Sequence, residues 1–148
     1  MLIRPIRPDE LAIAARQHRV GGCLIPGFDP TCIAFEATLA QYEALLQSGE
    51  IWVAEDNDVV VGHIGLEPGW VDQLFIETDK IGTGVGRALI LFAQQRQDDL
   101  QLYTFQSNSL GRRFYERAGF VIADMTDGAR NAEGQPDIRY HWMRERDI

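Results

Sequence analysis

A run of closely spaced glycines is the part of this sequence best suited to hold a ligand: Ile81-Gly-Thr-Gly-Val-Gly-Arg87. It follows the strand-like residues Trp70–Glu77 and opens an apolar, helix-like stretch. Glycines let a ligand approach the backbone closely, and the first turn of a helix leaves N–H groups unpaired. Because a helix N-terminus also carries partial positive charge, this junction predicts an anion pocket for a phosphate-bearing cofactor. A large side chain at Gly84 or Gly86 would block that approach.

The spacing of the glycines differs from two common phosphate-binding loops. A dinucleotide fingerprint needs Gly-x-Gly-x-x-Gly or a final Ala. In the first possible register Arg87 occupies that final position, and in the second Leu89 does. A P-loop needs Lys followed by Ser or Thr after its second glycine, and this loop has neither.

A second segment further along the chain reads Asn108-Ser-Leu-Gly-Arg-Arg-Phe-Tyr-Glu-Arg-Ala-Gly-Phe120. Together the two segments resemble the GNAT acetyltransferases, whose phosphate-binding loop has the pattern Gln/Arg-x-x-Gly-x-Gly/Ala. That family commonly carries an Asn, then a helix with Phe-Tyr-Glu, then Gly-Phe before the next strand. The resemblance implies acetyl-CoA as cofactor and direct transfer of its acetyl group to an amine.

The resemblance also implies how the cofactor is held. Strand residues would pair with the pantetheine arm, the loop would bind the pyrophosphate, and Arg87 with one of Arg112 or Arg113 would face the phosphates. The cofactor-binding residues so implied are Leu74, Phe75, Ile76, Gly82, Thr83, Gly84, Val85, Gly86, Arg87, Asn108 and Tyr115. From the residues alone, Asn108 suits a helix N-cap equally well. The apolar strand would also suit a fully paired core position.

Two residues are candidates for proton transfer. By the resemblance, Tyr115 protonates the thiolate that leaves when an amine attacks the thioester, although a boundary tyrosine with a packed ring explains it too. A lysine-like ammonium has a pKa near ~10.4 and must lose a proton before attack. Asp72 could take or relay that proton, and pairing with an arginine is an equally good explanation of it. Weaker candidates for this base are Glu36, Glu67 and His63.

Ile81 departs from the family pattern, which commonly has Gln or Arg at that position. An isoleucine side chain cannot donate a hydrogen bond, so we expect weaker cofactor binding rather than none. Ile81 therefore favours an alternative hypothesis, a non-catalytic acyl-CoA-binding or sensing module. A further alternative is transfer of a longer acyl group, or transfer to an oxygen acceptor.

The composition limits the class of protein. At 148 residues, with 45% hydrophobic and 24% charged residues, the chain is expected to form one soluble domain over residues 1–148. A net charge of -8 argues against nucleic-acid binding and would attract a cationic acceptor. No apolar run approaches the ~20 residues of a membrane span, and the N-terminus lacks the apolar core of a secretion signal. The expected location is the cytoplasm.

The cysteines and histidines predict no metal site. Cys23 and Cys32 lack CxxC spacing and have no histidine beside them at metal-ligand spacing, so we expect two free thiols. The expected partner is a small-molecule or peptide amine, without nucleic acid or membrane. Either one chain or a homodimer could carry out the reaction.

The periodicity of apolar residues predicts a mixed α/β sandwich in the order β-α-α-β-β-β-α-β-α-β-β, which is also the order of the GNAT fold. Asp56-Asn57-Asp58 is expected to form a hairpin turn. The predicted strands are Leu2–Arg7, Ile51–Glu55, Val59–Leu66, Trp70–Glu77, Leu100–Gln106, Phe120–Met125 and Ile138–Arg144. The predicted helices run from Pro8 to about Gly22, from about Phe35, from the glycine loop to about Arg96, and over Ser109–Ala118.

Overall fold

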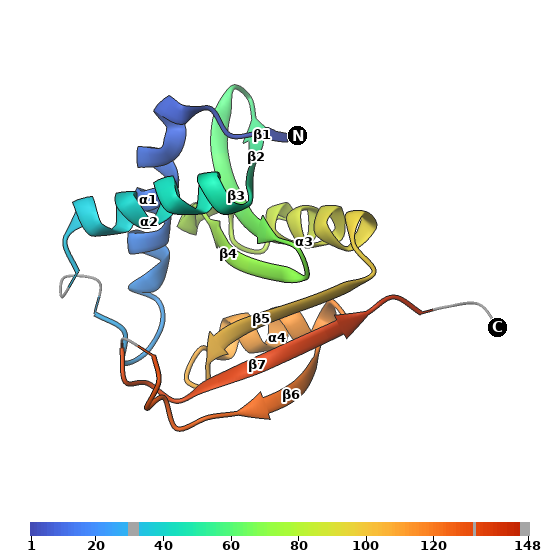
Figure 1. Ribbon diagram of the computed structural model, residues 1–148. Coiled ribbons are helices and arrows are strands. Elements are labelled where there is room, and N and C mark those ends of the chain that lie inside the picture. Colours follow the sequence, from blue (N-terminus) through green and yellow to red (C-terminus); the bar gives the residue numbers. More distant parts are fainter. Residues whose placement is uncertain (30–32, 132, 146–148) are drawn as a thin grey trace.

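A seven-stranded sheet is the framework of the computed structural model, which describes residues 1–29, 33–131 and 133–145 (Figure 1). The strand order is β1-β2-β3-β4-β5-β7-β6. Neighbouring strands run antiparallel except β4 and β5, which are parallel. The strands are β1 Leu2–Pro5, β2 Glu50–Asp56, β3 Val59–Glu67, β4 Trp70–Ile76, β5 Asp99–Phe105, β6 Val121–Met125 and β7 Asp137–Met143.

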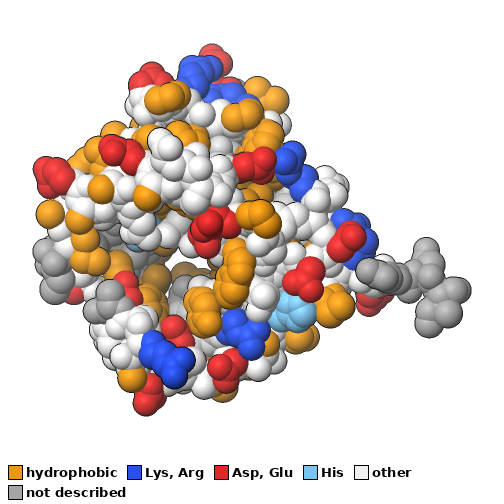
Figure 2. Space-filling view, in the orientation of Figure 1, with side chains coloured by type: hydrophobic (Ala, Val, Ile, Leu, Met, Phe, Trp, Pro, Cys, Tyr) orange, Lys and Arg blue, Asp and Glu red, His pale blue; other side chains and the backbone are white. Residues whose placement is uncertain are grey.

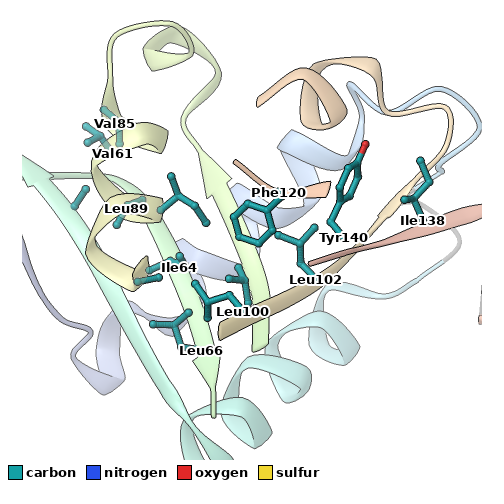
Figure 3. Close-up of a cluster of buried hydrophobic side chains, with 14 residues drawn as sticks. Val61, Ile64, Leu66, Val85, Leu89, Leu100, Leu102, Phe120, Ile138 and Tyr140 are labelled. Carbon is teal, nitrogen blue, oxygen red and sulfur yellow. The ribbon is translucent and has the colours of Figure 1, made fainter. Parts of the chain in front are cut away.

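Helices cover both faces of the sheet (Figure 1). They are η1 Pro8–Glu10, α1 Leu11–Gly22, α2 Phe35–Ser48, η3 Thr78–Lys80, α3 Val85–Arg96 and α4 Ser109–Arg117. Side chains alternate across each strand, so β2 contributes Ile51 and Val53 to a core with α1 and α2. On the other face Leu89 of α3 joins a core with β3, β5 and β7, which also contains Phe120 and Tyr140 (Figure 3). The predicted order of elements is confirmed.

The β2–β3 hairpin forms where the sequence predicts it. Asn57 and Asp58 have φ of 49° and 65°, the left-handed values that a two-residue type I′ turn requires at both central positions. Asn and Asp tolerate this conformation better than most residues. The turn fixes the register in which Trp52 faces Ile64.

The β4–β5 pair separates soon after it begins. Its ladder holds a single pair of residues, Trp70 with Gln101, and the Gln101 N–H donates to Gly69 O at 2.8 Å. Within the described chain the edge of β4 that faces β5 makes no further ladder pair up to Ile76. β4 is therefore not the fully paired core strand that its apolar pattern alone also allowed, and its edge toward β5 is free beyond Trp70.

Several element ends differ from the prediction by one or two residues. β1 ends at Pro5 because Arg7 already caps η1, and Pro8 starts that turn with its fixed φ. β6 starts at Val121 rather than Phe120. Gly119 has φ 95° and the Phe120 N–H donates to Tyr115 O, so these two residues still close the end of α4.

Candidate active site

A cavity of about 1050 Å³ opens where β4 and β5 diverge. Figure 2 shows a hollow on this face of the molecule. The cavity brings together five residues that the sequence singled out: Asp72, Leu74, Phe75, Asn108 and Tyr115. Ile76 and residues 82–87 do not line it. The predicted residues thus divide between the cavity and the glycine loop, which follows β4 along the chain.

The glycine loop leaves the start of α3 open. Gly84 has φ 96° and is the N-cap residue, yet no side chain caps the helix there. The first helical hydrogen bond joins the Ala88 N–H to Gly84 O at 3.0 Å, so the N–H groups of residues 85–87 have no partner within the helix. Gly82 also has a left-handed φ, of 84°. These open donors suit an anion, as the sequence predicted.

Gly86 also has a packing role that the sequence did not indicate. A Cβ at this position would lie 3.2 Å from the Phe114 ring, so the glycine allows α3 and α4 to pack closely. The expectation that a large side chain here blocks the phosphates stays a prediction. By contrast, an added Cβ at Gly82 or Gly84 meets nothing within 4 Å, and their positive φ explains why they are glycines.

Tyr115 lies on α4 with its ring in the core and on the wall of the cavity. Ring centroids lie 5.8 Å from Phe120 and 6.3 Å from Tyr140. Burial raises the pKa of the Tyr115 hydroxyl well above its ordinary value, with no charged group in the described chain opposing the shift. The phenol is therefore fully protonated at neutral pH, the state that a proton donor needs.

Asn108 caps α4. Its Oδ1 accepts from the Gly111 N–H at 3.1 Å, and its Nδ2 donates to Thr104 Oγ1 at 3.0 Å. A Cβ on Gly111 would lie 2.4 Å from Asn108 Nδ2, so the Asn108 amide would have to shift if this residue carried a side chain. The N-cap interpretation is confirmed. Contact with a cofactor stays a prediction. It is compatible with the cap, since the amide keeps acceptor capacity beyond these two bonds.

Asp72 occupies a β-bulge. Gly65 pairs with Gln73 and the next residue, Leu66, pairs with Val71, which leaves Asp72 as the extra residue of β4. Although Asp72 is exposed at this rim, partial desolvation raises the pKa of its carboxyl to about 7, and contact with the Glu67 carboxyl adds to the shift. The structure thus pairs Asp72 with an acid, where pairing with an arginine was the alternative.

The remaining candidates lie away from these positions. Glu36 is exposed on α2 and does not line the cavity. Arg87 lines a smaller cleft between α3 and α4, together with Arg117. The Arg112 guanidinium donates to Gln106 O at 3.2 Å. Cys23 is a free, exposed thiol, and Cys32 lies outside the described residues.

No pattern in the sequence indicates the buried chain of polar side chains that lies beneath the cavity. His63 of β3 was only one of the weaker candidates for the general base. It is fully buried and hydrogen-bonds both Tyr42 of α2 and Gln17 of α1. His18 of α1 continues this chain and lines the cavity. These residues come from three elements that are far apart in sequence, so only the tertiary structure brings them together.

The described residues contain neither a metal-binding cluster nor a membrane-spanning helix. Over residues 1–29, 33–131 and 133–145, no cluster of three or more His, Cys, Asp or Glu side chains is arranged to hold a metal ion. Within the same ranges, every helix is too short or too polar to cross a bilayer.

Comparison with known proteins identifies the family. Residues 47–122 match the model of the acetyltransferase (GNAT) domain, and the chain belongs to this family. Among relatives, the peptidyl-lysine N-acetyltransferase YiaC of Escherichia coli (strain K12) is 30% identical over 83 residues, which cover 55% of this chain and 57% of YiaC. The chain thus matches little more than half of that relative's length.

Solved structures share the fold over nearly the whole chain. The solution structure of apo YjaB from Escherichia coli superposes with a TM-score of 0.75 at 22% identity, covering 97% of this chain and 98% of YjaB. YncA from Salmonella typhimurium, solved with its cofactor acetyl-CoA, gives a TM-score of 0.74 at 16% identity, covering 100% of this chain and 96% of YncA. The described architecture is that of the GNAT fold.

Proposed function

We propose that this chain is an acetyl-CoA-dependent N-acetyltransferase that transfers an acetyl group directly to an amine. The observation that carries the proposal is that Asp72 and Tyr115, from separate elements, line one cavity where β4 leaves β5. The Tyr115 phenol holds its proton at neutral pH, and the Asp72 carboxyl titrates near neutral pH. Such a pair suits acid–base catalysis of acyl transfer.

Two features of the chain fit acetyl-CoA. The free edge of β4 offers backbone N–H and C=O groups to an extended, amide-containing arm, which can add to the sheet as a strand does. The open N-terminus of α3 offers N–H donors to phosphates. YncA, which shares the fold, was solved with this cofactor. We therefore assign the cofactor-binding role to Leu74–Ile76 and to residues 82–87.

Acetyl-CoA, when bound, supplies the thioester whose acetyl group is transferred. Asp72 accepts a proton from the acceptor ammonium, directly or through water, and leaves the amine free to attack. The C–N bond forms as the C–S bond breaks, and Tyr115 donates its phenol proton to the departing sulfur. The second proton of the attacking nitrogen then returns to the Tyr115 phenolate, which restores the phenol and leaves a neutral amide. Cys23 does not line the cavity, which supports transfer without a covalent enzyme intermediate.

The name of YiaC suggests the acceptor class to try first. It is a peptidyl-lysine N-acetyltransferase, so we propose a lysine side chain in a peptide as acceptor, with small amines as the alternative. We propose the cytoplasm as the location of the reaction, since a reducing compartment keeps thiols such as that of Cys23 free.

The first test is binding of coenzyme A. A ligand that binds only the folded state stabilises it by about 2.7 kcal/mol at a hundredfold excess over Kd, which raises Tm. Thr83 is exposed in the glycine loop, so Thr83→Glu adds a negative charge that should weaken binding. Thr83→Gln is the matched control, with similar size and no charge. Absence of a thermal shift at millimolar coenzyme A would contradict the proposal.

The second test separates catalysis from binding. Ile81, at 47% exposure in the loop, favours a non-catalytic acyl-CoA-binding module as the second candidate function. Release of free thiol from acetyl-CoA is measured with lysine peptides and a panel of small amines. Acceptor-dependent release identifies the transferase. Coenzyme A binding without turnover on any acceptor favours the binding module.

A further inference from the structure

A chain of hydrogen bonds lies beneath the cavity and joins residues of α1, α2 and β3, whose arrangement Figure 1 shows, to Glu77 just after β4. His18 Nδ1 lies 3.0 Å from the Tyr42 hydroxyl, and that hydroxyl lies 2.7 Å from His63 Nε2. His63 Nδ1 lies 2.7 Å from Gln17 Oε1. Gln17 Nε2 donates to Glu77 Oε1 at 3.1 Å, and Arg16 holds that carboxylate in an ion pair of 2.6 Å. The series of hydrogen bonds thus ends on the charged Glu77 carboxylate, which Arg16 holds in place.

Gln17 fixes the proton on His63. The Gln17 Nε2 amide group donates to Val60 O at 3.1 Å as well as to Glu77, and both partners are pure acceptors. Gln17 Oε1 therefore faces His63 Nδ1 as an acceptor, so Nδ1 carries the hydrogen. Burial lowers the pKa of His63 to about 3, so the ring is neutral and its Nε2 is unprotonated.

Through Tyr42, the position of the hydrogen on His63 also determines which ring nitrogen of His18 carries a hydrogen. Because His63 Nε2 has no hydrogen, the Tyr42 hydroxyl donates to it, and the Tyr42 oxygen must accept from His18 Nδ1. Burial also lowers the pKa of His18, to about 4, with the charge of Arg19 contributing. Neutral His18 is thus held as the Nδ1–H tautomer, and its Nε2 carries a free lone pair.

The orientation of the ring turns that lone pair away from the core. The Nδ1 edge of His18 faces the fully buried Tyr42, while the ring lies on Phe75 with centroids 4.5 Å apart. His18 and Phe75 both line the cavity that Asp72 and Tyr115 share. Among the described residues the hydrogen bond of the His18 ring is the one at Nδ1, and none is made at Nε2. The network therefore presents one hydrogen-bond acceptor at the cavity wall.

We propose that His18 Nε2 binds the acceptor by accepting a hydrogen bond from its amine N–H, and that Tyr42 and His63 are positioning residues that fix its tautomer. This inference rests on the proposed transferase function. The lone pair suits a donor, which excludes thioester and phosphate oxygens and leaves the acceptor amine and the amide N–H groups of the cofactor's arm. The free edge of β4 already offers C=O groups to those amides, so the amine is the partner we assign to His18. His18 binds and orients the amine, whereas Asp72 removes its proton.

The tautomer is tested without any activity measurement. The sequence has three histidines, so long-range proton–nitrogen correlation spectra of the labelled protein at pH 7 give three ring patterns, assigned by single substitutions. We expect His18 and His63 to show protonated Nδ1 and unprotonated Nε2. In Tyr42→Phe, His18 should lose this fixed pattern. An Nε2–H tautomer at His18 in the wild type would overturn the inference.

Kinetics with two matched variants test the binding role. The Asn amide reaches the Nδ1 position of a histidine and can keep the link to Tyr42, whereas the Gln amide reaches the Nε2 position. His18→Asn should raise KM for the amine roughly tenfold, the value of about one hydrogen bond, and leave KM for acetyl-CoA unchanged. His18→Gln should recover most of that loss.

The outcomes distinguish this inference from the proposed function. Unchanged KM for the amine in a folded His18→Asn, with an active wild type, would overturn the role of His18 alone. A rise only in KM for acetyl-CoA would mean that Nε2 meets an amide N–H of the cofactor, and would overturn it equally. A wild type inactive on every amine would overturn the proposed function and this inference with it.

Discussion

The carboxyl group of Asp72 lies in hydrogen-bonding contact with the carboxyl group of Glu67, at the β3–β4 turn. The bulge in β4 makes Asp72 the extra residue just after Val71. Two neighbouring carboxylates resist ionising together, so one of them keeps a proton to a higher pH. With a pKa of about 7, Asp72 can exchange protons with an amine near neutral pH.

The first prediction follows from that pair. Ionised Asp72 is the base, so kcat/KM should fall as the pH drops below about 7. Glu67→Gln removes the neighbouring charge, lowers the pKa of Asp72, and should move this limb to lower pH with the plateau retained. Asp72→Asn should remove the limb and reduce turnover by about 10²–10⁴-fold. Profiles from pH 5.5 to 9 measure both effects, and an identical limb in Asp72→Asn would assign the base elsewhere.

Local signals explain what could be predicted from the sequence. The Asn57-Asp58 turn, the glycine loop and the Asn108 cap are each encoded within a few residues, and the structure has all three. Tyr115 could be found because its motif is continuous in the chain. The packing role of Gly86 was missed because its neighbour, Phe114, lies on a different helix. The His18–Tyr42–His63 chain was missed for the same reason.

The second prediction concerns Ile81. The side chain is 47% exposed, so it is not packed beneath the loop and can be replaced without a cavity. Ile81→Gln adds a donor at the position where the family commonly has Gln or Arg. Cofactor binding should tighten by about 0.5–1.5 kcal/mol, the value of one net hydrogen bond, with Tm of the free protein unchanged. Calorimetric titration of both proteins decides the question, and weaker binding in the variant would show that the apolar residue is required.

The third prediction is a loss of stability on acidification that begins near pH 6.5. The folded pKa values of His18 and His63 lie at about 4 and 3, below the ordinary 6.5. From pH 6.5 downward the unfolded chain binds these protons and the folded chain does not, so the free energy of unfolding falls. Asp72 acts oppositely between its ordinary 3.8 and about 7, because the folded state holds that proton.

Chemical denaturation at several pH values measures this loss. The slope should steepen in Asp72→Asn, which removes the opposing group. The effect is separable from that of Glu10, whose pKa of about 2, lowered chiefly by its hydrogen bond with Arg4, costs stability only below about pH 4.5. A free energy of unfolding that stays flat between pH 7 and 4.5 would contradict the buried, neutral state of the two histidines.

The last prediction concerns Tyr115, whose ring and hydroxyl have separable roles. The ring packs against Phe120 and Tyr140, and Tyr115→Phe preserves those contacts while removing the proton donor. Folding and cofactor affinity should therefore be nearly unchanged, and turnover should fall by about 10²–10⁴-fold. The fall should be smaller for a thioester whose thiol has a lower pKa, because that sulfur leaves with less help. If Tyr115→Phe acetylates amines at the wild-type rate, the tyrosine is structural, and water or the amine's own proton must serve the leaving thiolate.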